Sequence, residues 1–147
     1  MGWSDWYECS FDSNGEIDTR PVNNHAPNKP GIYAIAMKDA DTNDYVVQYI
    51  GMSKTNIETR LKTHFRGNGN KYIKTRLEQK KDKHRTMERV NALYFMFLET
   101  SKEQARGMES LFVRGTVPIA NIQQNLSQSW LPRDLRDTEV EVELDDD

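Results

Sequence analysis

Apolar residues gather in three short runs along the chain, and polar turns separate the runs. Residues 31–38 are mostly apolar and follow Pro30, which predicts a buried strand. Residues 39–44 are rich in Asp, Thr and Asn, as expected of a hairpin turn, and residues 45–51 predict the returning strand. Residues 90–98 are the most hydrophobic run and predict a third strand.

Strict alternation along the returning strand predicts which of its residues share a face of the sheet. One face is expected to carry Tyr45, Val47 and Tyr49, and the other to carry Val46, Gln48 and Ile50. Nearer the N-terminus, residues 3–11 are compatible with a further short strand. Residues 12–30 contain several Pro and Asn and predict a loop or an arm.

Helical periodicity fills the gaps between the strands. Thr55 and Glu58 have the spacing of a capping box, and the apolar residues after them recur at helical spacing. A Gly-Asn-Gly-Asn sequence at residues 67–70 ends that helix. A second, basic helix is predicted from Asn70 to about Lys83, and a third over residues 101–114.

The predicted fold is therefore α/β, with a small, largely antiparallel three-stranded sheet flanked by helices. An N-terminal arm is expected over residues 1–30, a core over residues 31–121, and a C-terminal extension with an acidic tail over residues 122–147.

Charge is distributed unevenly, although the formal net charge is only −3. Residues 52–89 carry twelve Lys or Arg against four acidic residues, which suits a polyanion or, equally, a solvated helical surface. Residues 133–147 carry eight acidic residues against two Arg. This tail has two interpretations: a solvated segment that competes with a polyanion for the basic block, or, from the alternation of apolar residues with Glu, an ordered edge strand.

Several classes of protein are excluded. No run of apolar residues is long enough for a transmembrane helix, and the first residues do not have the pattern of a secretory signal. The single cysteine, Cys9, excludes an internal disulfide and a cysteine-rich zinc site. We expect a reducing compartment, cytoplasmic (at the nucleoid) or nuclear, and not secretion.

Three residues on the predicted helices suggest chemistry. Glu109 lies at helical spacing from apolar residues, so its carboxylate needs a cation, a hydrogen-bond network or a metal; an ion pair with Arg106 is the alternative. Arg60 and His64 lie four residues apart on one side of the first helix. Arg offers a planar set of donors for phosphate and His can transfer a proton, whereas a solvated helix flank is the simpler interpretation.

Two tripeptides change this picture. Gly31-Ile32-Tyr33 opens the first strand and Tyr49-Ile50-Gly51 closes the second. Together they resemble the GIY-YIG nuclease superfamily, which is named after them. In that family a helix follows with an Arg and, in many members, a His one turn later. A later helix carries a metal-binding Glu, then come a Pro and an Asn. The matching residues here are Arg60, His64, Glu109, Pro118 and Asn121.

The resemblance covers residues 31–121, and the chain departs from the family pattern at two points. The connector between the two tyrosine strands is longer than in the shortest members. Met52 follows Gly51 where many relatives carry Lys or Gln, and Lys54 is the candidate to take over that basic role.

The resemblance implies phosphodiester hydrolysis with one divalent ion, Mg²⁺ or Mn²⁺, held by Glu109. Tyr33 would be the general base, and because a phenol has an ordinary pKa of about 10, neighbouring cations would have to lower it. The resemblance also implies that Arg60 would contact the phosphate and that Tyr49 would orient water. His64 would form a hydrogen bond to a tyrosine or assist proton transfer, and Asn121 would support the strand–helix junction.

The basic block then has a candidate partner, double-stranded DNA, because Lys and Arg that neutralise phosphates supply affinity independent of sequence. The residues expected in this contact are Lys54, Lys71, Lys74, Arg76, Lys80, Lys81, Lys83 and Arg85. The predicted function is that of a small restriction-type or repair-type endonuclease, which needs a homodimer or sequential nicking to cut both strands. The alternatives are a catalytically silent DNA-binding module and an acidic protein that mimics DNA.

Overall fold

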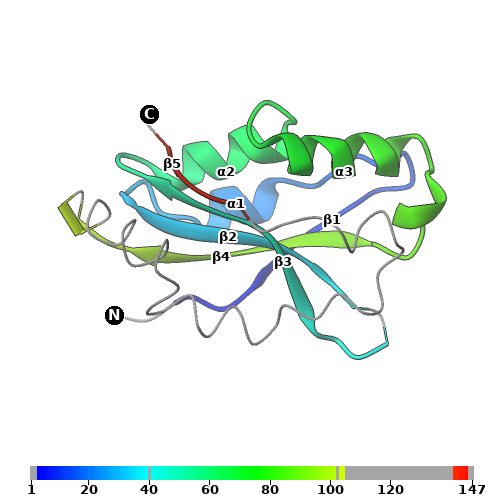
Figure 1. Cartoon of the computed structure of the whole chain (residues 1–147), viewed down its shortest axis with the longest axis horizontal. Helices are drawn as coiled ribbons and strands as arrows, with labels where there is room; N and C mark the ends of the chain where they lie inside the picture. The colour runs from blue at the N-terminus through cyan, green and yellow to red at the C-terminus, as the bar shows by residue number, and fades with distance from the viewer. Residues whose placement is uncertain (1–2, 40, 102, 105–140, 146–147) are drawn as a thin grey trace.

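The computed structural model describes residues 3–39, 41–101, 103–104 and 141–145. Within these ranges one sheet has the strand order β1-β4-β2-β3-β5, and helices α1, α2 and α3 cover one of its faces (Figure 1). The predicted α/β class is confirmed.

The centre of the sheet is the predicted three-stranded unit. Strand β2 (Gly31–Lys38) is hydrogen-bonded to β3 (Tyr45–Ser53) on one side and to β4 (Ala92–Glu99) on the other, both antiparallel. The hairpin turn between β2 and β3 lies where the polar connector predicted it, and Asn43 adopts a positive φ of 63° there. Alternation and turn chemistry were enough to predict this unit.

The sheet has five strands, two more than the central three that were predicted, because a further strand covers each edge. Strand β1 (Tyr7–Ser10) pairs antiparallel with β4. Strand β5 (Glu141–Asp145) pairs parallel with β3. An open edge exposes unpaired backbone groups, so both additions satisfy groups that the central strands would otherwise leave open. For residues 141–145, the edge-strand interpretation of the acidic tail is the one that the structure shows.

The two longer helices begin at asparagines. In α2 (Ile57–Phe65) the N-cap is Asn56, whose side chain accepts a hydrogen bond from the N–H of Thr59 over 3.0 Å. The predicted cap at Thr55 was therefore wrong by one residue. In α3 (Lys71–Lys81) the N-cap is Asn70, and the helix ends two residues before the predicted end. Asn is among the strongest N-cap residues because its carbonyl satisfies free N–H groups of the first turn.

A further short helix, α1 (Arg20–His25), lies within the stretch that was predicted to be a loop or arm. Pro21 occupies its first turn, where a missing N–H is harmless, and Val22 is buried beneath it.

The predicted helix over residues 101–114 lies almost wholly outside the described residues. Its start shows a reciprocal cap, in which Ser101 and Gln104 each accept a hydrogen bond from the other's N–H.

A bulge in β3 corrects the predicted distribution of its side chains. The register shifts between Ile35 and Ala36 of β2, so Ile35 pairs with Tyr49 and Ala36 pairs with Val47. Gln48 is the extra residue. Tyr49 consequently lies on the helix side of the sheet, in the same cluster as Val46, whereas Tyr45, Val47, Ile50 and Met52 belong to the cluster on the opposite side. A bulge of this kind re-aims the side chains that follow it.

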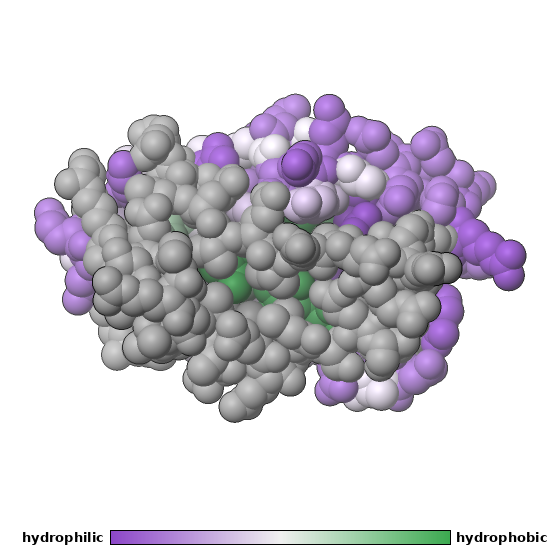
Figure 2. All heavy atoms as spheres, viewed as in Figure 1, coloured by the Kyte–Doolittle hydropathy of each residue, from purple (hydrophilic) through white to green (hydrophobic). Residues whose placement is uncertain are grey.

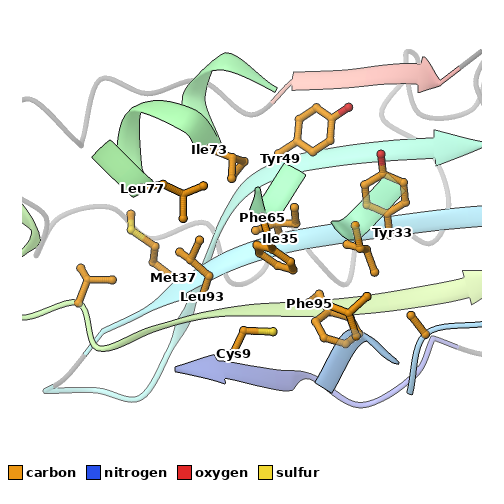
Figure 3. Packing of buried hydrophobic residues seen from close by; sticks show 14 of the residues in the cluster. Cys9, Tyr33, Ile35, Met37, Tyr49, Phe65, Ile73, Leu77, Leu93 and Phe95 are labelled. Atoms are coloured by element: carbon orange, nitrogen blue, oxygen red, sulfur yellow. The ribbon is translucent and has the colours of Figure 1, made fainter. Parts of the chain in front are cut away.

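The core on the helix side contains both motif tyrosines. Tyr33 and Tyr49 are fully buried there together with aliphatic and aromatic residues of the sheet and of all three helices (Figure 3). Their hydroxyl groups point the same way, away from the apolar centre of the cluster around Phe65 and Ile35 (Figure 3). The fold thus delivers two phenolic oxygens to one end of an apolar layer.

Candidate active site

Both motif glycines occupy positions where a side chain would not fit. A Cβ at Gly51 would lie 2.6 Å from the Oη of Tyr33 and 2.9 Å from a ring carbon of Tyr49, because the two rings lie over this residue. A Cβ at Gly31 would collide with the backbone of Leu98 and lie 2.7 Å from Ile57 Cδ1. The glycines therefore serve close packing of strand against ring and of strand against helix.

Tyr33, Tyr49 and His64 form one cluster. The ring centroids lie 6.1 Å apart for the two tyrosines, 5.5 Å for Tyr33 and His64, and 4.8 Å for Tyr49 and His64. The Oη of Tyr33 lies 2.7 Å from Nε2 of His64. Strand pairing brings the tyrosines together, and α2 places His64 above them, so three residues distant in sequence share one site.

His64 is fully buried and has hydrogen-bond partners at both ring nitrogens. Nδ1 accepts from the backbone N–H of Asn70 over 2.9 Å, opposite the contact of Nε2 with Tyr33. Burial lowers the pKa of His64 to about 3, and the positive charge of Arg60 contributes to the shift in the same direction. His64 is accordingly a neutral imidazole near neutral pH.

Arg60 lies one turn before His64 on α2 and is half-buried. Its electrostatic effect on His64 places its charge beside the cluster, as the spacing of the two residues predicted. Lys54 is half-buried and directly follows β3. Glu109 and Asn121 lie outside the described residues, so their expected positions stay predictions.

The predicted DNA-binding residues divide into exposed and buried members. Those with exposed side chains are Lys71, Lys74, Lys81, Lys83 and Arg85, and Figure 2 shows hydrophilic residues gathered over α3. Arg76 is only 3% exposed. Lys80 is half-buried; its Nζ donates to the carbonyl of Met87 over 3.1 Å and lies 5.6 Å from the ring centre of Phe11. Partial burial also lowers the pKa of Lys80.

Arg76 and Lys80 therefore do not belong to the exposed part of the basic block, and their contact with DNA stays a prediction. The sequence did contain the signal, because Ile73, Arg76, Leu77 and Lys80 follow one another at helical spacing on a single stripe. Ile73 and Leu77 are buried on that stripe, and it faces the core.

Two residues that were not predicted for the site contact it, and a third, Arg66, belongs to the exposed basic surface. Arg66 lines a hollow of about 490 Å³ together with Lys74 and Lys81, and neither the two motif tyrosines nor His64 line that hollow. Asn70 supplies the N–H to His64, and a Cβ at Gly69 would fall on Nδ1 of the same ring. In the sequence, Arg66 could have been identified as one more basic residue at the end of the first predicted helix. The two backbone contacts had no sequence signal beyond their place in the loop.

No group of three or more His, Cys, Asp or Glu side chains in the described ranges is arranged to hold a metal ion. Glu109, which the sequence predicted as the metal ligand, lies outside those ranges. Among the helices that the structure describes, none has the length and hydropathy needed to cross a membrane.

A family model, the GIY-YIG catalytic domain, matches residues 29–114, which is more than half of the 147 residues. The matched segment contains Tyr33, Tyr49, Arg60, His64 and Glu109, and it ends before Asn121. No curated protein and no solved structure matches the chain.

Proposed function

The chain belongs to the GIY-YIG family of nuclease domains, and we propose that it is a divalent-metal-dependent endonuclease that hydrolyses phosphodiester bonds in DNA. The family implies phosphodiester hydrolysis of a nucleic acid. The observation that carries the finer proposal is the contact between Tyr33 and His64, which places a hydrogen-bonding imidazole 2.7 Å from the phenolic oxygen that would act as the base.

In the proposed reaction Tyr33 is the phenolate. It accepts a proton from a water molecule, the resulting hydroxide forms a bond to phosphorus, and the bond between phosphorus and O3′ breaks. The departing oxygen takes a proton from solvent, which leaves a 5′-phosphate and a 3′-hydroxyl. Tyr49, whose ring packs against His64, would orient the water or the phosphate.

Arg60 is the proposed contact to the scissile phosphate. Its guanidinium carries a fixed positive charge and a planar set of donors that match phosphate oxygens. Because negative charge builds up on those oxygens in the transition state, a cation beside the tyrosine cluster would stabilise the transition state more than the bound substrate. The effect of Arg60 on His64 supports a position close to the cluster.

Glu109 is the proposed ligand of Mg²⁺ or Mn²⁺, with water completing the coordination. Asn121 would support the strand–helix junction near the metal. A single carboxylate with several waters is the coordination that Mg²⁺ commonly takes. When bound, the ion would stabilise negative charge on the phosphoryl and departing oxygens.

The fully buried state of Tyr33 and Tyr49 adds a requirement. Water and phosphate have to reach the two hydroxyl groups, so the proposal requires a local rearrangement at that end of the cluster when DNA binds. The exposed lysines of α3, together with Arg66, would hold the DNA backbone during this step through charge alone.

The direct test is incubation of the full chain with supercoiled plasmid in the presence of Mg²⁺ or of EDTA. We expect nicked and linear products with Mg²⁺ and intact plasmid with EDTA. Glu109→Gln should abolish cleavage and leave DNA affinity within a few fold, because the substitution removes a ligand and not the basic surface. Wild-type cleavage by this variant would contradict the metal assignment.

The same assay separates the alternatives. A catalytically silent binding module would retain plasmid affinity and cut nothing at any metal concentration. A DNA mimic would fail to bind plasmid altogether.

A further inference from the structure

The two sides of the His64 ring meet partners of different kinds. At Nδ1 the partner is a backbone N–H, that of Asn70, at 2.9 Å. At Nε2 the partner is the Oη of Tyr33, at 2.7 Å. A backbone N–H can only donate, so Nδ1 carries the lone pair, and the single proton of the neutral ring is on Nε2. His64 therefore donates a hydrogen bond to Tyr33.

The reverse arrangement would leave a conflict in the core. If Nε2 were the acceptor, the proton would sit on Nδ1 and face the N–H of Asn70, and the same clash would follow from a doubly protonated ring. The charged or titratable groups that face the ring come from several elements: Tyr33 from β2, Tyr49 from β3 and Arg60 from α2 itself. A positive neighbour such as Arg60 also opposes the protonated ring.

Local structure holds the Asn70 amide in place. Asn70 is only 6% exposed, and its side chain caps α3 by accepting from the N–H groups of Tyr72 and Ile73 at 2.9 and 3.2 Å. Gly69 precedes it, and any Cβ there would fall on the His64 ring. The cap fixes the amide, and the glycine lets the loop approach the ring closely enough for the hydrogen bond to form.

We propose that Gly69 and the backbone amide of Asn70 are positioning elements of the active site, which lock His64 as a permanent hydrogen-bond donor to Tyr33 and prevent it from accepting a proton. A donor at the phenolic oxygen stabilises the phenolate over the phenol, which is the form that a base requires. The catalytic consequence rests on the proposed function, whereas the tautomer of His64 follows from the two hydrogen-bond contacts alone.

The tautomer can be read directly by nuclear magnetic resonance on the full chain labelled with ¹⁵N at histidine. The chain has three histidines, and the spectrum of His64→Gln identifies the signals that belong to His64. We expect a proton-bearing Nε2 and a proton-free Nδ1, unchanged between about pH 5 and pH 8. The opposite tautomer, or titration within that range, overturns the proposal whether or not the chain cleaves DNA.

Gly69→Ala tests the positioning element. The added methyl has to displace the His64 ring, so we expect the ¹⁵N signals of His64 to change and cleavage at neutral pH to fall by about 10-fold or more, with the pH–rate profile moved to higher pH. Asn68→Ala is the matched control, an exposed residue of the same loop, and should leave both readouts as in the wild type. Wild-type signals for His64 in Gly69→Ala would overturn the proposal.

His64→Gln and His64→Ala separate a donor from a proton acceptor. The Gln amide can donate to the Oη of Tyr33 but cannot take a proton at neutral pH. A donor role predicts that Gln retains cleavage within about 10-fold of the wild type while Ala loses about 10²-fold. If Gln and Ala are equally inactive in folded protein, His64 transfers protons and the proposal is wrong.

Discussion

The tyrosine–histidine cluster and the basic surface of α3 are organised in opposite ways. Tyr33, Tyr49 and His64 have no exposed surface, and short contacts hold each ring against its neighbours. Lys71, Lys74 and Lys81 are exposed on a helix. Proton transfer requires donor–acceptor distances that are correct to within a few tenths of an ångström, whereas attraction to a phosphate backbone needs only charge of the right sign. Substitutions in the cluster should therefore lower the cleavage rate, and substitutions on the basic surface should lower the affinity for DNA.

The largest effect is expected from Tyr33→Phe. Loss of the phenolic oxygen removes the proposed base and should lower the rate of plasmid cleavage by about 10²-fold or more. The phenyl ring still fills the core, but Nε2 of His64 loses the Oη of Tyr33 as a partner, so the melting temperature should fall modestly and cleavage is compared where both proteins are folded. In the wild type, the rate should rise between neutral and alkaline pH as the phenol ionises. A Phe variant that cleaves normally, with the same pH profile, would remove Tyr33 from the mechanism.

The next largest effect concerns the exposed surface. The triple variant Lys71→Ala, Lys74→Ala and Lys81→Ala should bind DNA with a weaker dependence of affinity on salt concentration. The slope of log affinity against log salt should fall by the amount that about three phosphate contacts contribute. Between about 50 and 200 mM salt, the wild type should then lose about 40-fold more affinity than the triple variant. The single-turnover rate at saturating DNA should stay close to that of the wild type, because none of the three lysines contacts the cluster in the described contacts.

Arg76→Met is the matched control for that experiment. Arg76 lies on the same helix and carries the same charge, but its side chain is buried. Its loss should lower the melting temperature and leave the salt dependence of DNA binding unchanged. If Arg76→Met lowers the salt dependence of DNA binding as much as substitution of one exposed lysine does, the distinction between buried and exposed basic residues is wrong.

Sequence patterns predicted the local part of this architecture. Strand pairing is regular, so the two tripeptides predicted that Tyr33 and Tyr49 lie on neighbouring strands, and the family resemblance implied that His64 contacts a tyrosine. The bulge at Gln48 was not predicted, although it determines the face on which Tyr49 lies. It adds one residue to a strand whose composition gives no sign of it.

Contacts between distant segments were the part that sequence could not supply. The pairing of β1 with β4 and of β5 with β3 depends on which open edge each segment meets after the centre of the sheet has formed. Likewise, the hydrogen bond to His64 comes from the backbone of Asn70, and every non-proline residue has the same N–H. A count of charges also cannot separate an exposed lysine from a buried arginine unless helical position is considered with it.

Removal of residues 141–147 tests the edge of the sheet. The deletion takes away β5 and uncovers β3, whose loss of hydrogen bonds we expect to lower the free energy of unfolding by about 2 kcal/mol. The matched variant Glu141→Gln, Glu143→Gln and Asp145→Asn keeps the strand and removes its charge, so it should melt like the wild type. If both variants instead bind DNA more tightly at low salt and melt normally, the tail acts through charge and not as a strand.

The last prediction is a pH dependence of stability that comes from His64. Its pKa in the folded chain is about 3, below the ordinary value of 6.5, so the unfolded chain binds a proton that the folded chain excludes. The contribution of His64 is therefore complete above about pH 6.5 and declines as the pH falls toward 3, by about 1 kcal/mol per pH unit. Urea unfolding of the wild type and of His64→Gln between about pH 4 and pH 8 isolates this term, because the carboxylates contribute equally to both proteins. The Gln variant should lose less stability below pH 6.5 than the wild type does. Equal slopes would mean that His64 is accessible to protons in the folded chain, and the tyrosine–histidine cluster would then resemble the exposed surface more than the buried core.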